Sequence, residues 1–383
     1  MEELEKAGQH FLDILKEQLL RVKKIKEQGD FIDYSNLNTI KIGICPGDGI
    51  GPNIISAAKE VIFFLLKKEI EEKKVEIINI EGLTIENRAK LKQSVPFEVL
   101  EQIKSCDVLL KGPTTTPRKG DKWPALESAN VVLRKELDLF ANVRPIKIEE
   151  EGIDWVFFRE NTEGSYTLGS KGLNLSELCI DFTISTKVGS ERIAKLAFEY
   201  AKKTKRKKVS IITKANIIKT TDGSFLEICK EIAKDYPSIE VDDWYVDITA
   251  AKLVDLNSRK DFSVLLLPNL YGDILTDEAA QLQGGVGTAG SANIGKKYAM
   301  FEAVHGSAPR MVEAGLACYA DPTSILKAVV LMLSHIGFLE KSEKLEKALN
   351  FCLKKDSKIK VTGFKTGATT KEFCEFLIET LKN

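Results

Sequence analysis

The sequence predicts an α/β protein of two domains, and three observations lead to this prediction. Short apolar runs alternate with amphipathic helical segments from Ile40 almost to the C-terminus, the pattern of a largely parallel sheet covered by helices. The chain has 383 residues, more than one hydrophobic core usually serves. No apolar run reaches the roughly 20 residues needed to span a bilayer. We therefore expect two α/β domains and no membrane span.

Composition narrows the classes of partner and metal. The 56 basic residues balance the 56 acidic residues, so the chain lacks the broad positive field of a nucleic-acid-binding protein. Seven cysteines are scattered without a C-x-x-C pair, as expected for reduced thiols, and we recognise no signal peptide, so we expect a cytoplasmic protein. With only three histidines, a bound metal should be a hard cation held by carboxylates.

Residues 1–36 form a charged, helix-favouring extension. Leu12, Leu15, Leu19 and Val22 recur at spacings of three and four, which gives the helix one apolar stripe. Phe11 and Ile25 widen or extend this stripe. Two interpretations stay open: the helix packs on the body of the protein, or it is a self-association or partner helix.

After this extension, strands and helices follow in turn. The expected strands are IKIGIC, VEIINI, DVLLKG, DWVFFR, KVSIIT, FSVLLLP and YAMFEA, and the main expected helices cover 53–68, 96–105, 191–203, 222–234, 273–282 and 321–338. The turn from Gly47 to Gly51 has the spacing G-x-G-x-G, which differs from the G-x-G-x-x-G of a Rossmann dinucleotide site. A tight turn that needs positive φ at glycine is the preferred interpretation.

Three arginines, Arg134, Arg144 and Arg159, lie near the ends of expected elements. Arg134 follows Asn130 by four residues and shares its helix face, and Ser128 stands close to the start of the same helix. A guanidinium fork matches a carboxylate bidentately, so this set would suit a substrate with several carboxylates. Alternatively, each arginine is a surface or salt-bridge residue.

Acidic residues supply candidate metal ligands. Asp273 and Asp277 are one turn apart on one face of an expected helix, and Asp247 lies at the foot of another. Two such carboxylates can share a divalent cation, or they are a helix N-cap and a first-turn acid. Tyr166 and Lys214 are candidates for proton transfer, with a hydrogen-bonded tyrosine and a surface lysine as the alternatives.

Eight motifs follow one another along the chain: PGDGIGP, KGPTTTP, LRKELDLFANVRP, RENTEG, KAN, NLYGDILTD, GGVGTAGSANIG and HGSAP. In this order they resemble the isocitrate and isopropylmalate dehydrogenase family of β-decarboxylating enzymes, from about Ile40 to the C-terminus. The resemblance implies two α/β domains around a cleft and not a Rossmann fold. The expected large domain, on the cofactor side, is 37–139 with 284–383, and the small domain is 140–283 with a dimer-forming arm near 164–186. A homodimer or larger homo-oligomer with shared active sites is also implied.

The resemblance assigns roles residue by residue. The residues that bind the substrate carboxylates are Arg134, Arg144 and Arg159. The ligands of Mg²⁺ or Mn²⁺ are Asp273 and Asp277, with Asp247 supplied by the partner subunit. The general acid is Tyr166, and the lysine that assists proton removal across the interface is Lys214. Positions near the nicotinamide are Thr115, Thr116 and Asn216, and those on the adenosine side are His305, Gly306, Ala308, Arg310 and Asp321.

The short segment Ser128-Ala-Asn130 decides the expected substrate. In the family, polar residues here accompany isocitrate, whereas isopropylmalate enzymes have apolar ones; a buried Ser or Asn facing an isopropyl group would lose hydrogen bonds at ~1–3 kcal/mol each. We therefore expect oxidative decarboxylation of the tricarboxylate isocitrate to 2-oxoglutarate with NAD or NADP. Isopropylmalate, homoisocitrate and tartrate remain alternative substrates, and a non-catalytic regulatory subunit is an alternative function. Arg310 favours the 2′-phosphate of NADP, although Met311 replaces the tyrosine common in NADP-using members.

Overall fold

The computed structural model describes residues 2–118, 120–169, 171–354 and 357–383. The chain forms two compact units, unit 1 (Met1–Phe31 and Lys147–Glu278) and unit 2 (Ile32–Ile146 and Ala279–Asn383). The predicted ranges were 140–283 for the small domain and 37–139 with 284–383 for the large one. The N-terminal helix, predicted as a separate extension, is grouped with unit 1.

Unit 2 contains a mixed sheet in the order β2-β1-β3-β12-β11-β4. Its strands are β1 (Ile40–Cys45), β2 (Val75–Asn79), β3 (Val108–Lys111), β4 (Ala141–Ile148, ending in unit 1), β11 (Gly290–Ile294) and β12 (Ala299–Ala303). The first four in this order are parallel, but β11 is antiparallel to both β12 and β4. Only residues 295–298 separate β11 from β12, too few for a parallel crossover. The α/β prediction is confirmed, with these antiparallel strands as an addition.

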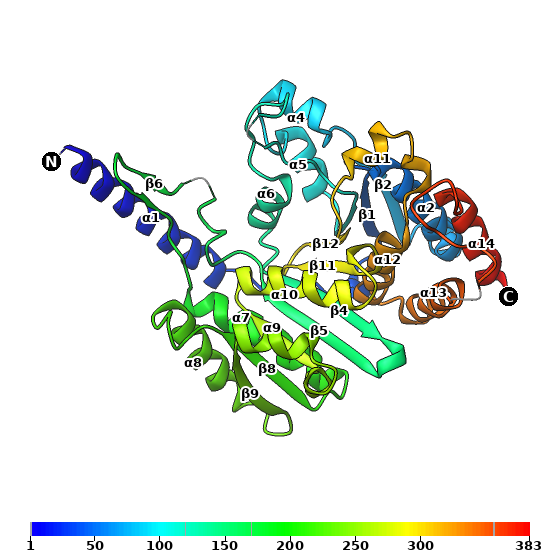
Figure 1. Ribbon diagram of the computed structural model, residues 1–383. Helices are drawn as coiled ribbons and strands as arrows, with labels where there is room; N and C mark the ends of the chain where they lie inside the picture. Colours follow the sequence, from blue (N-terminus) through cyan, green and yellow to red (C-terminus); the bar gives the residue numbers. More distant parts are fainter. Residues whose placement is uncertain (1, 119, 170, 355–356) are drawn as a thin grey trace. The chain divides into compact units, whose positions relative to one another are not determined.

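Helices cover the sheet of unit 2 (Figure 1). They are α2 (Gly51–Leu65), α3 (Lys67–Glu71), α4 (Ile85–Leu91), α5 (Phe97–Lys104), α6 (Ala129–Glu136), α11 (Pro309–Glu313), α12 (Thr323–His335), α13 (Leu339–Cys352) and α14 (Thr370–Lys382). The turn before α2 has φ +70° at Gly47 and +61° at Gly49, as predicted. A Cβ on Gly49 would lie 1.9 Å from the carbonyl oxygen of Ser307, so a second loop approaches this turn closely.

Unit 1 contains four parallel strands in the order β5-β10-β8-β9. These are β5 (Ile153–Glu160), β8 (Lys208–Thr213), β9 (Glu240–Tyr245) and β10 (Val264–Leu267), and the helices are α1 (Glu2–Lys26), α7 (Lys187–Lys203), α8 (Thr221–Ala233), α9 (Val246–Val254) and α10 (Asn269–Leu282). All four residues of β10 are buried. Helix α10 begins four residues before the predicted start at Asp273, and this difference matters for the site.

The predicted arm, 164–186, carries the antiparallel hairpin β6 (Leu173–Asn174) and β7 (Cys179–Ile180); its residue 170 lies outside the described residues. Helix α1 runs beside this hairpin (Figure 1). Lys171 Nζ donates to Glu17 Oε2 at 2.9 Å, and the backbone N–H of Ser176 donates to Glu3 Oε1 at 2.8 Å. These polar contacts, together with the rings of Phe11 and Phe182 at 5.6 Å between centroids, attach α1 to the arm.

The face of α1 that packs coincides only in part with the predicted stripe. Ile14 and Ile25 are buried, whereas Leu12, Leu15 and Leu19 of the stripe are exposed. The helix therefore packs on unit 1, as one of the two interpretations expects, but through a face that lies beside these leucines.

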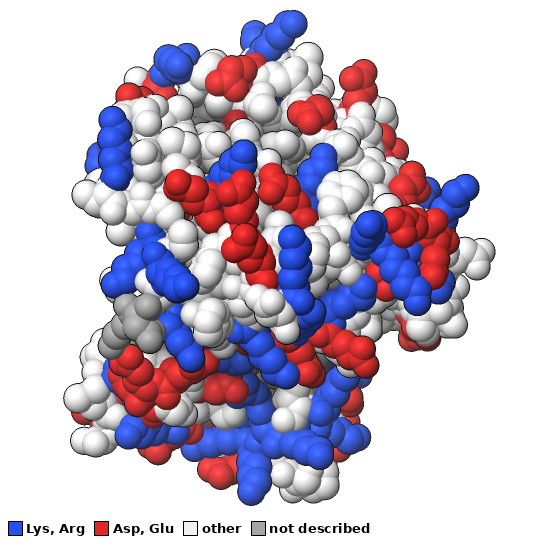
Figure 2. Space-filling model, turned by 90° about the vertical axis from the view of Figure 1, so that its right-hand side faces the viewer, with Lys and Arg blue, Asp and Glu red and all other residues white. Residues whose placement is uncertain are grey.

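Surface charge and hydropathy agree with the composition. Acidic and basic side chains both occur across the face shown in Figure 2. Among the described residues, no helix combines the length and the apolar character needed to cross a membrane.

Candidate active site

Three of the predicted residues meet directly in unit 1. Arg159 lies near the end of β5, Asp273 lies in α10, and Tyr166 lies in the arm. Arg159 Nη1 donates to Asp273 Oδ1, and the Tyr166 hydroxyl donates to Asp273 Oδ2 at 2.6 Å. The guanidinium carbon of Arg159 also lies 5.3 Å from the centre of the Tyr166 ring. One carboxylate thus contacts a cation for anion binding and a phenol that can carry a proton.

Asn269, which no sequence pattern singled out, orients Arg159. Its Oδ1 accepts hydrogen bonds from Nε at 3.0 Å and from Nη2 at 2.7 Å, while its Nδ2 donates to the carbonyl of Glu163 at 2.9 Å. A Cβ on Gly272 would lie 2.5 Å from Cγ of Arg159, so glycine leaves the room through which this side chain runs. Asn269 and Gly272 stand in the motif NLYGDILTD, which was the available signal.

The start of α10 decides between two interpretations of the aspartate pair. Because the helix begins at Asn269, Asp273 lies more than one turn inside it and is not an N-cap. The capping interpretation is therefore wrong. Asp277 follows four residues later on the same face and is exposed.

The donor set near Asp273 fits a hard cation. Mg²⁺ usually takes one or two protein carboxylates and keeps several waters. Across the described parts of the chain, no cluster of three or more His, Cys, Asp or Glu side chains is placed to hold a metal. The carboxylates of Asp273 and Asp277 on α10 are therefore the metal ligands that this part of the chain can provide.

Lys214 and Asp247 form a second pair in unit 1. Lys214 follows β8, Asp247 is in the first turn of α9, and Nζ lies 2.5 Å from Oδ1. The hydrogen bond from Lys214 lowers the pKa of Asp247. The backbone N–H of Lys214 donates to Asp222 Oδ2 at 2.7 Å, which holds the loop. The predicted position of Lys214 just before a helix is wrong, because α8 begins only at Thr221.

In unit 2, the glycine turn joins two loops with predicted cofactor residues. Asp48 accepts hydrogen bonds from the backbone N–H groups of Thr115 and Ile85, both at 2.7 Å. Ile50 N donates to the carbonyl of Ser307 at 3.1 Å, and the hydroxyls of Thr115 and Ser307 lie 2.8 Å apart. The turn therefore holds Thr115 beside the HGSAP loop.

The HGSAP loop continues directly into α11. His305 Nδ1 lies 3.0 Å from the carbonyl oxygen of Gly306, and Gly306 is exposed. Ala308 has φ +46°, in the region that glycine usually occupies. This strained backbone turns the chain into the helix that begins at Pro309.

The remaining predicted cofactor residues are Thr116, Asn216, Arg310 and Asp321. Thr116 and Arg310 in unit 2 are exposed, as is Asn216 in unit 1. Asp321 Oδ1 accepts the backbone N–H of Thr323 at 2.8 Å, at the start of α12.

Arg134 takes part in a buried charge cluster. Its Nη2 lies 3.3 Å from Glu302 Oε1, and Lys111 Nζ lies 3.2 Å from Glu302 Oε2. Burial raises the pKa of Glu302, but the charges of Lys111 and Arg134 and a hydrogen bond from Asn293 outweigh it and bring the pKa to about 2. No sequence pattern singled out Lys111 and Glu302, whose burial depends on the pairing of β3 with β12.

The other predicted substrate residues lie on α6 and β4. Ser128 lies at the start of α6, as expected, where it is the N-cap residue. Asn130 Oδ1 accepts a hydrogen bond from Thr114 Oγ1 at 3.0 Å. Arg144 is buried and lies in the middle of β4, so its predicted place near the end of an element is wrong.

Glu163 connects α1 to the loop that carries Tyr166. Arg21 Nη2 lies 2.5 Å from Glu163 Oε1, and the backbone N–H of Thr186 donates to Oε2 at 2.7 Å. Glu160 is buried close by. Burial, followed by the charge of Glu163, raises the pKa of Glu160 to about 7.

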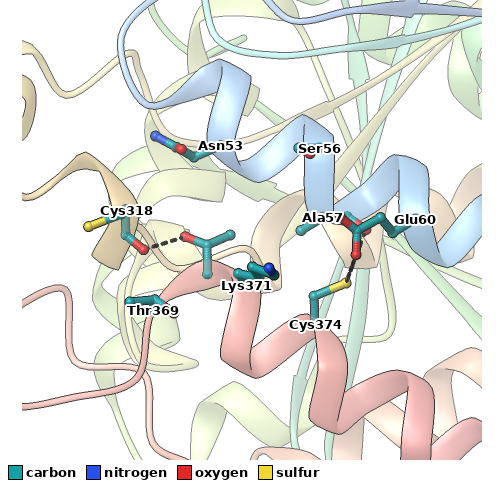
Figure 3. Close-up of a pocket in the computed structure, with 9 residues that line it drawn as sticks. Asn53, Ser56, Ala57, Glu60, Cys318, Thr369, Lys371 and Cys374 are labelled. Atoms are coloured by element: carbon teal, nitrogen blue, oxygen red, sulfur yellow. Dashed lines mark hydrogen bonds between the residues drawn. The ribbon is translucent and has the colours of Figure 1, made fainter.

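A cavity of about 370 Å³ in unit 2 lies between α2, the segment around Cys318 and the start of α14 (Figure 3). Thr370 Oγ1 donates to the carbonyl of Cys318 at 3.1 Å, and Cys374 Sγ lies 3.7 Å from Glu60 Oε2. The described residues that line it include none of the predicted site residues.

Comparisons with known proteins agree with the motifs. The sequence model of the family described as isocitrate/isopropylmalate dehydrogenase matches residues 41–377. Homoisocitrate dehydrogenase of Methanocaldococcus jannaschii is 38% identical over 330 residues, which cover 82% of this chain and 90% of the relative. NADP isocitrate dehydrogenase of Rickettsia prowazekii is 36% identical over 353 residues, 89% of this chain and 69% of the relative; subunits named for NAD match as well.

The fold agrees with that of solved relatives. The crystal structure of isocitrate dehydrogenase from Methylococcus capsulatus superposes with a TM-score of 0.78 at 36% sequence identity, covering 90% of this chain and all of that one. Together, the motif order, the α/β fold and the extent of these matches show that the chain belongs to the isocitrate/isopropylmalate dehydrogenase family of β-decarboxylating dehydrogenases.

Proposed function

We propose that the chain oxidatively decarboxylates isocitrate to 2-oxoglutarate, using NAD or NADP and Mg²⁺ or Mn²⁺. The observation that carries this proposal is the carboxylate of Asp273, which contacts both Arg159 and Tyr166. A cation ligand, a carboxylate-binding guanidinium and a proton carrier thus lie within hydrogen-bond distance. These are the groups that decarboxylation of a hydroxy acid requires in addition to a hydride acceptor.

The roles follow from the chemistry of each side chain. Asp273 and Asp277 would hold the cation, which when bound supplies Lewis acidity toward the oxygens of the substrate. Arg159 would bind a substrate carboxylate, since Asn269 keeps its planar fork in one orientation. After CO₂ leaves, Tyr166 would deliver its Oη proton to the carbon that held the carboxylate.

A second subunit would complete the site. Large apolar side chains are exposed at the end of β9, on α9, on α10 and in the loop after β8, namely Ile217, Ile218, Tyr245, Ile248, Leu270 and Ile274. Exposed apolar patches of this kind typically mark a protein interface. We propose that this face forms a homodimer in which Lys214 and Asp247 serve the partner's site.

Homoisocitrate is the second candidate substrate, favoured by the similarity to the Methanocaldococcus enzyme. It is longer than isocitrate by one methylene, and an enzyme typically distinguishes two substrates that differ by one methylene by ~1–3 kcal/mol of transition-state binding energy. Ser128 and Asn130 offer polar groups at the start of α6 and support isocitrate, whose third carboxylate needs donors. For the coenzyme, the exposed guanidinium of Arg310 beside the HGSAP loop supports NADP.

Steady-state kinetics test the proposal. The assay compares isocitrate, homoisocitrate, isopropylmalate and tartrate, each with Mg²⁺ or Mn²⁺ and with NAD or NADP. We expect the highest kcat/KM for isocitrate with NADP. A higher value for another acid would overturn the substrate assignment. Inactivity on all four, with activation of a partner chain, would indicate a regulatory subunit instead.

A further inference from the structure

The apolar side of α1 that faces solvent is a candidate interaction surface. It consists of Leu4, Phe11, Leu12, Leu15 and Leu19, here called the α1 stripe, which are 68%, 43%, 50%, 40% and 69% exposed. Leu4 and Phe11 are seven residues apart, and Leu12, Leu15 and Leu19 follow at spacings of three and four. Phe11 and Leu12 are adjacent, so the stripe is about 100° wide around the helix, with Leu12 and Leu19 at one edge and Phe11 at the other. The side that packs on unit 1 adjoins the stripe, with Ile14, Gln18 and Ile25 buried, and the ring of Phe11 at the edge between the two lies 5.6 Å from the ring of Phe182. Five large apolar residues in contiguous positions are uncommon on a monomer surface.

Charge along α1 changes sign from one end to the other. Glu3 and Glu5 lie in its first turns, and the last turn carries Lys23, Lys24 and Lys26. A second α1 in the antiparallel direction would bring the acidic end of each helix close to the basic end of the other. A parallel copy would bring like charges together. The helix is thus complementary in charge to an antiparallel copy of itself.

The spacing of the stripe is also self-complementary. In an antiparallel pair centred between Phe11 and Leu12, Leu4 faces Leu19 of the other helix, and Phe11 faces Leu12. Gly8 then faces Leu15. A Cβ on Gly8 would meet nothing within 4 Å, so the surface there has room for a leucine side chain. This gives a two-fold, isologous contact roughly 22 Å long at 1.5 Å per residue.

We propose that the α1 stripe pairs with the α1 stripe of a second copy of this chain in the antiparallel direction. The pairing lies outside the region that matches the family, residues 41–377, and it does not depend on the proposed catalytic activity. It adds to the dimer proposed for the α9–α10 face.

Two adjacent leucines make a matched test. Leu19 is in the stripe, and Leu20, 62% exposed, points about 100° away around the helix. The masses of full-length wild-type protein, Leu19→Glu and Leu20→Glu are measured by light scattering over a dilution series, with circular dichroism as the control for folding. We expect Leu19→Glu to raise the dissociation constant of the assembly at least tenfold and Leu20→Glu to change it less than twofold. Equal behaviour of the two variants would overturn the proposal.

Disulfide cross-linking tests the direction of the helices. In a background with Cys179→Ser and Cys318→Ser, which removes the exposed thiols, Leu4→Cys protein is mixed with Leu19→Cys protein and oxidised. We expect a covalent dimer with one chain of each kind, and no dimer from Leu4→Cys alone. Absence of the mixed dimer, or efficient cross-linking of Leu4→Cys alone, would contradict antiparallel pairing.

Discussion

Replacing Asn269 by alanine tests whether this side chain controls Arg159. Asn269 Oδ1 accepts two hydrogen bonds from the guanidinium, and both side chains are only 1% exposed, so water cannot readily replace the lost acceptor. Hydrogen bonds to charged groups contribute ~1.5–3 kcal/mol each, and an unpaired buried donor costs a similar amount. Asp273 still pairs with Nη1 in the variant. We therefore expect a total loss of about 2–4 kcal/mol of folding free energy.

Two measurements follow the effect of Asn269→Ala. The midpoint of thermal unfolding should fall by roughly 5–10 °C, whereas Asn257→Ala, at an exposed position of the same unit, should leave it nearly unchanged. The KM for isocitrate should rise about tenfold, which corresponds to ~1.4 kcal/mol, with a smaller change in kcat, because Arg159 would bind the substrate carboxylate in ground state and transition state alike. A variant with wild-type midpoint and wild-type KM would refute the argued role of Asn269.

Three further predictions concern metal and pH. Asp277→Asn should raise the Mg²⁺ concentration for half-maximal activity at least tenfold without changing the circular dichroism spectrum; an unchanged Mg²⁺ requirement removes Asp277 from the metal site. Burial and the charge of Glu163 raise the pKa of Glu160 from 4.5 to about 7. Between these pH values the folded protein therefore binds more protons than the unfolded chain, and the free energy of unfolding should fall as pH rises from 4.5 to 7. Arg21→Ala should steepen this fall and Glu160→Gln should flatten it, as measured by the unfolding midpoint against pH. Glu302 has its pKa lowered to about 2, so its stabilisation should be lost as pH falls from 4.5 to 2, and Glu302→Gln should remove that dependence.

The alternation of apolar strands and helices was enough to predict the α/β fold, but not every strand. β9 has only partly buried or exposed residues, so its sequence EVDDWY lacks the continuous apolar run of a buried strand. β11, GSANI, consists mostly of small and polar residues, and it becomes a strand through its pairing with β12 and β4. β4 contains Pro145, which weakens strand signals. These strands depend on tertiary contacts that no local pattern reports.

Site residues, too, could be predicted where a local pattern places them and not where a tertiary contact does. Asp273 and Asp277 could be predicted because a spacing of four on a helix places both on one face. Asn269 could not, because its role is a hydrogen bond to the guanidinium of Arg159, which lies 110 residues away in the chain. The contact of Lys111 with Glu302, in a charge cluster buried between paired strands, likewise arises only in the folded sheet.

The N-terminal helix shows why an amphipathic pattern does not determine which face packs. The apolar residues of α1 span a side wider than one contact can cover. Arg21 contacts Glu163, Glu17 contacts Lys171 and Glu3 contacts Ser176, and the ring of Phe11 lies 5.6 Å from that of Phe182. With α1 held in this rotation, Ile14 and Ile25 are buried and Leu12, Leu15 and Leu19 are exposed. A helix that is already held by these contacts gains little from exposed leucines unless another surface covers them. The physical reason for the α1 stripe is therefore to be sought in a second copy rather than in the fold of the single chain.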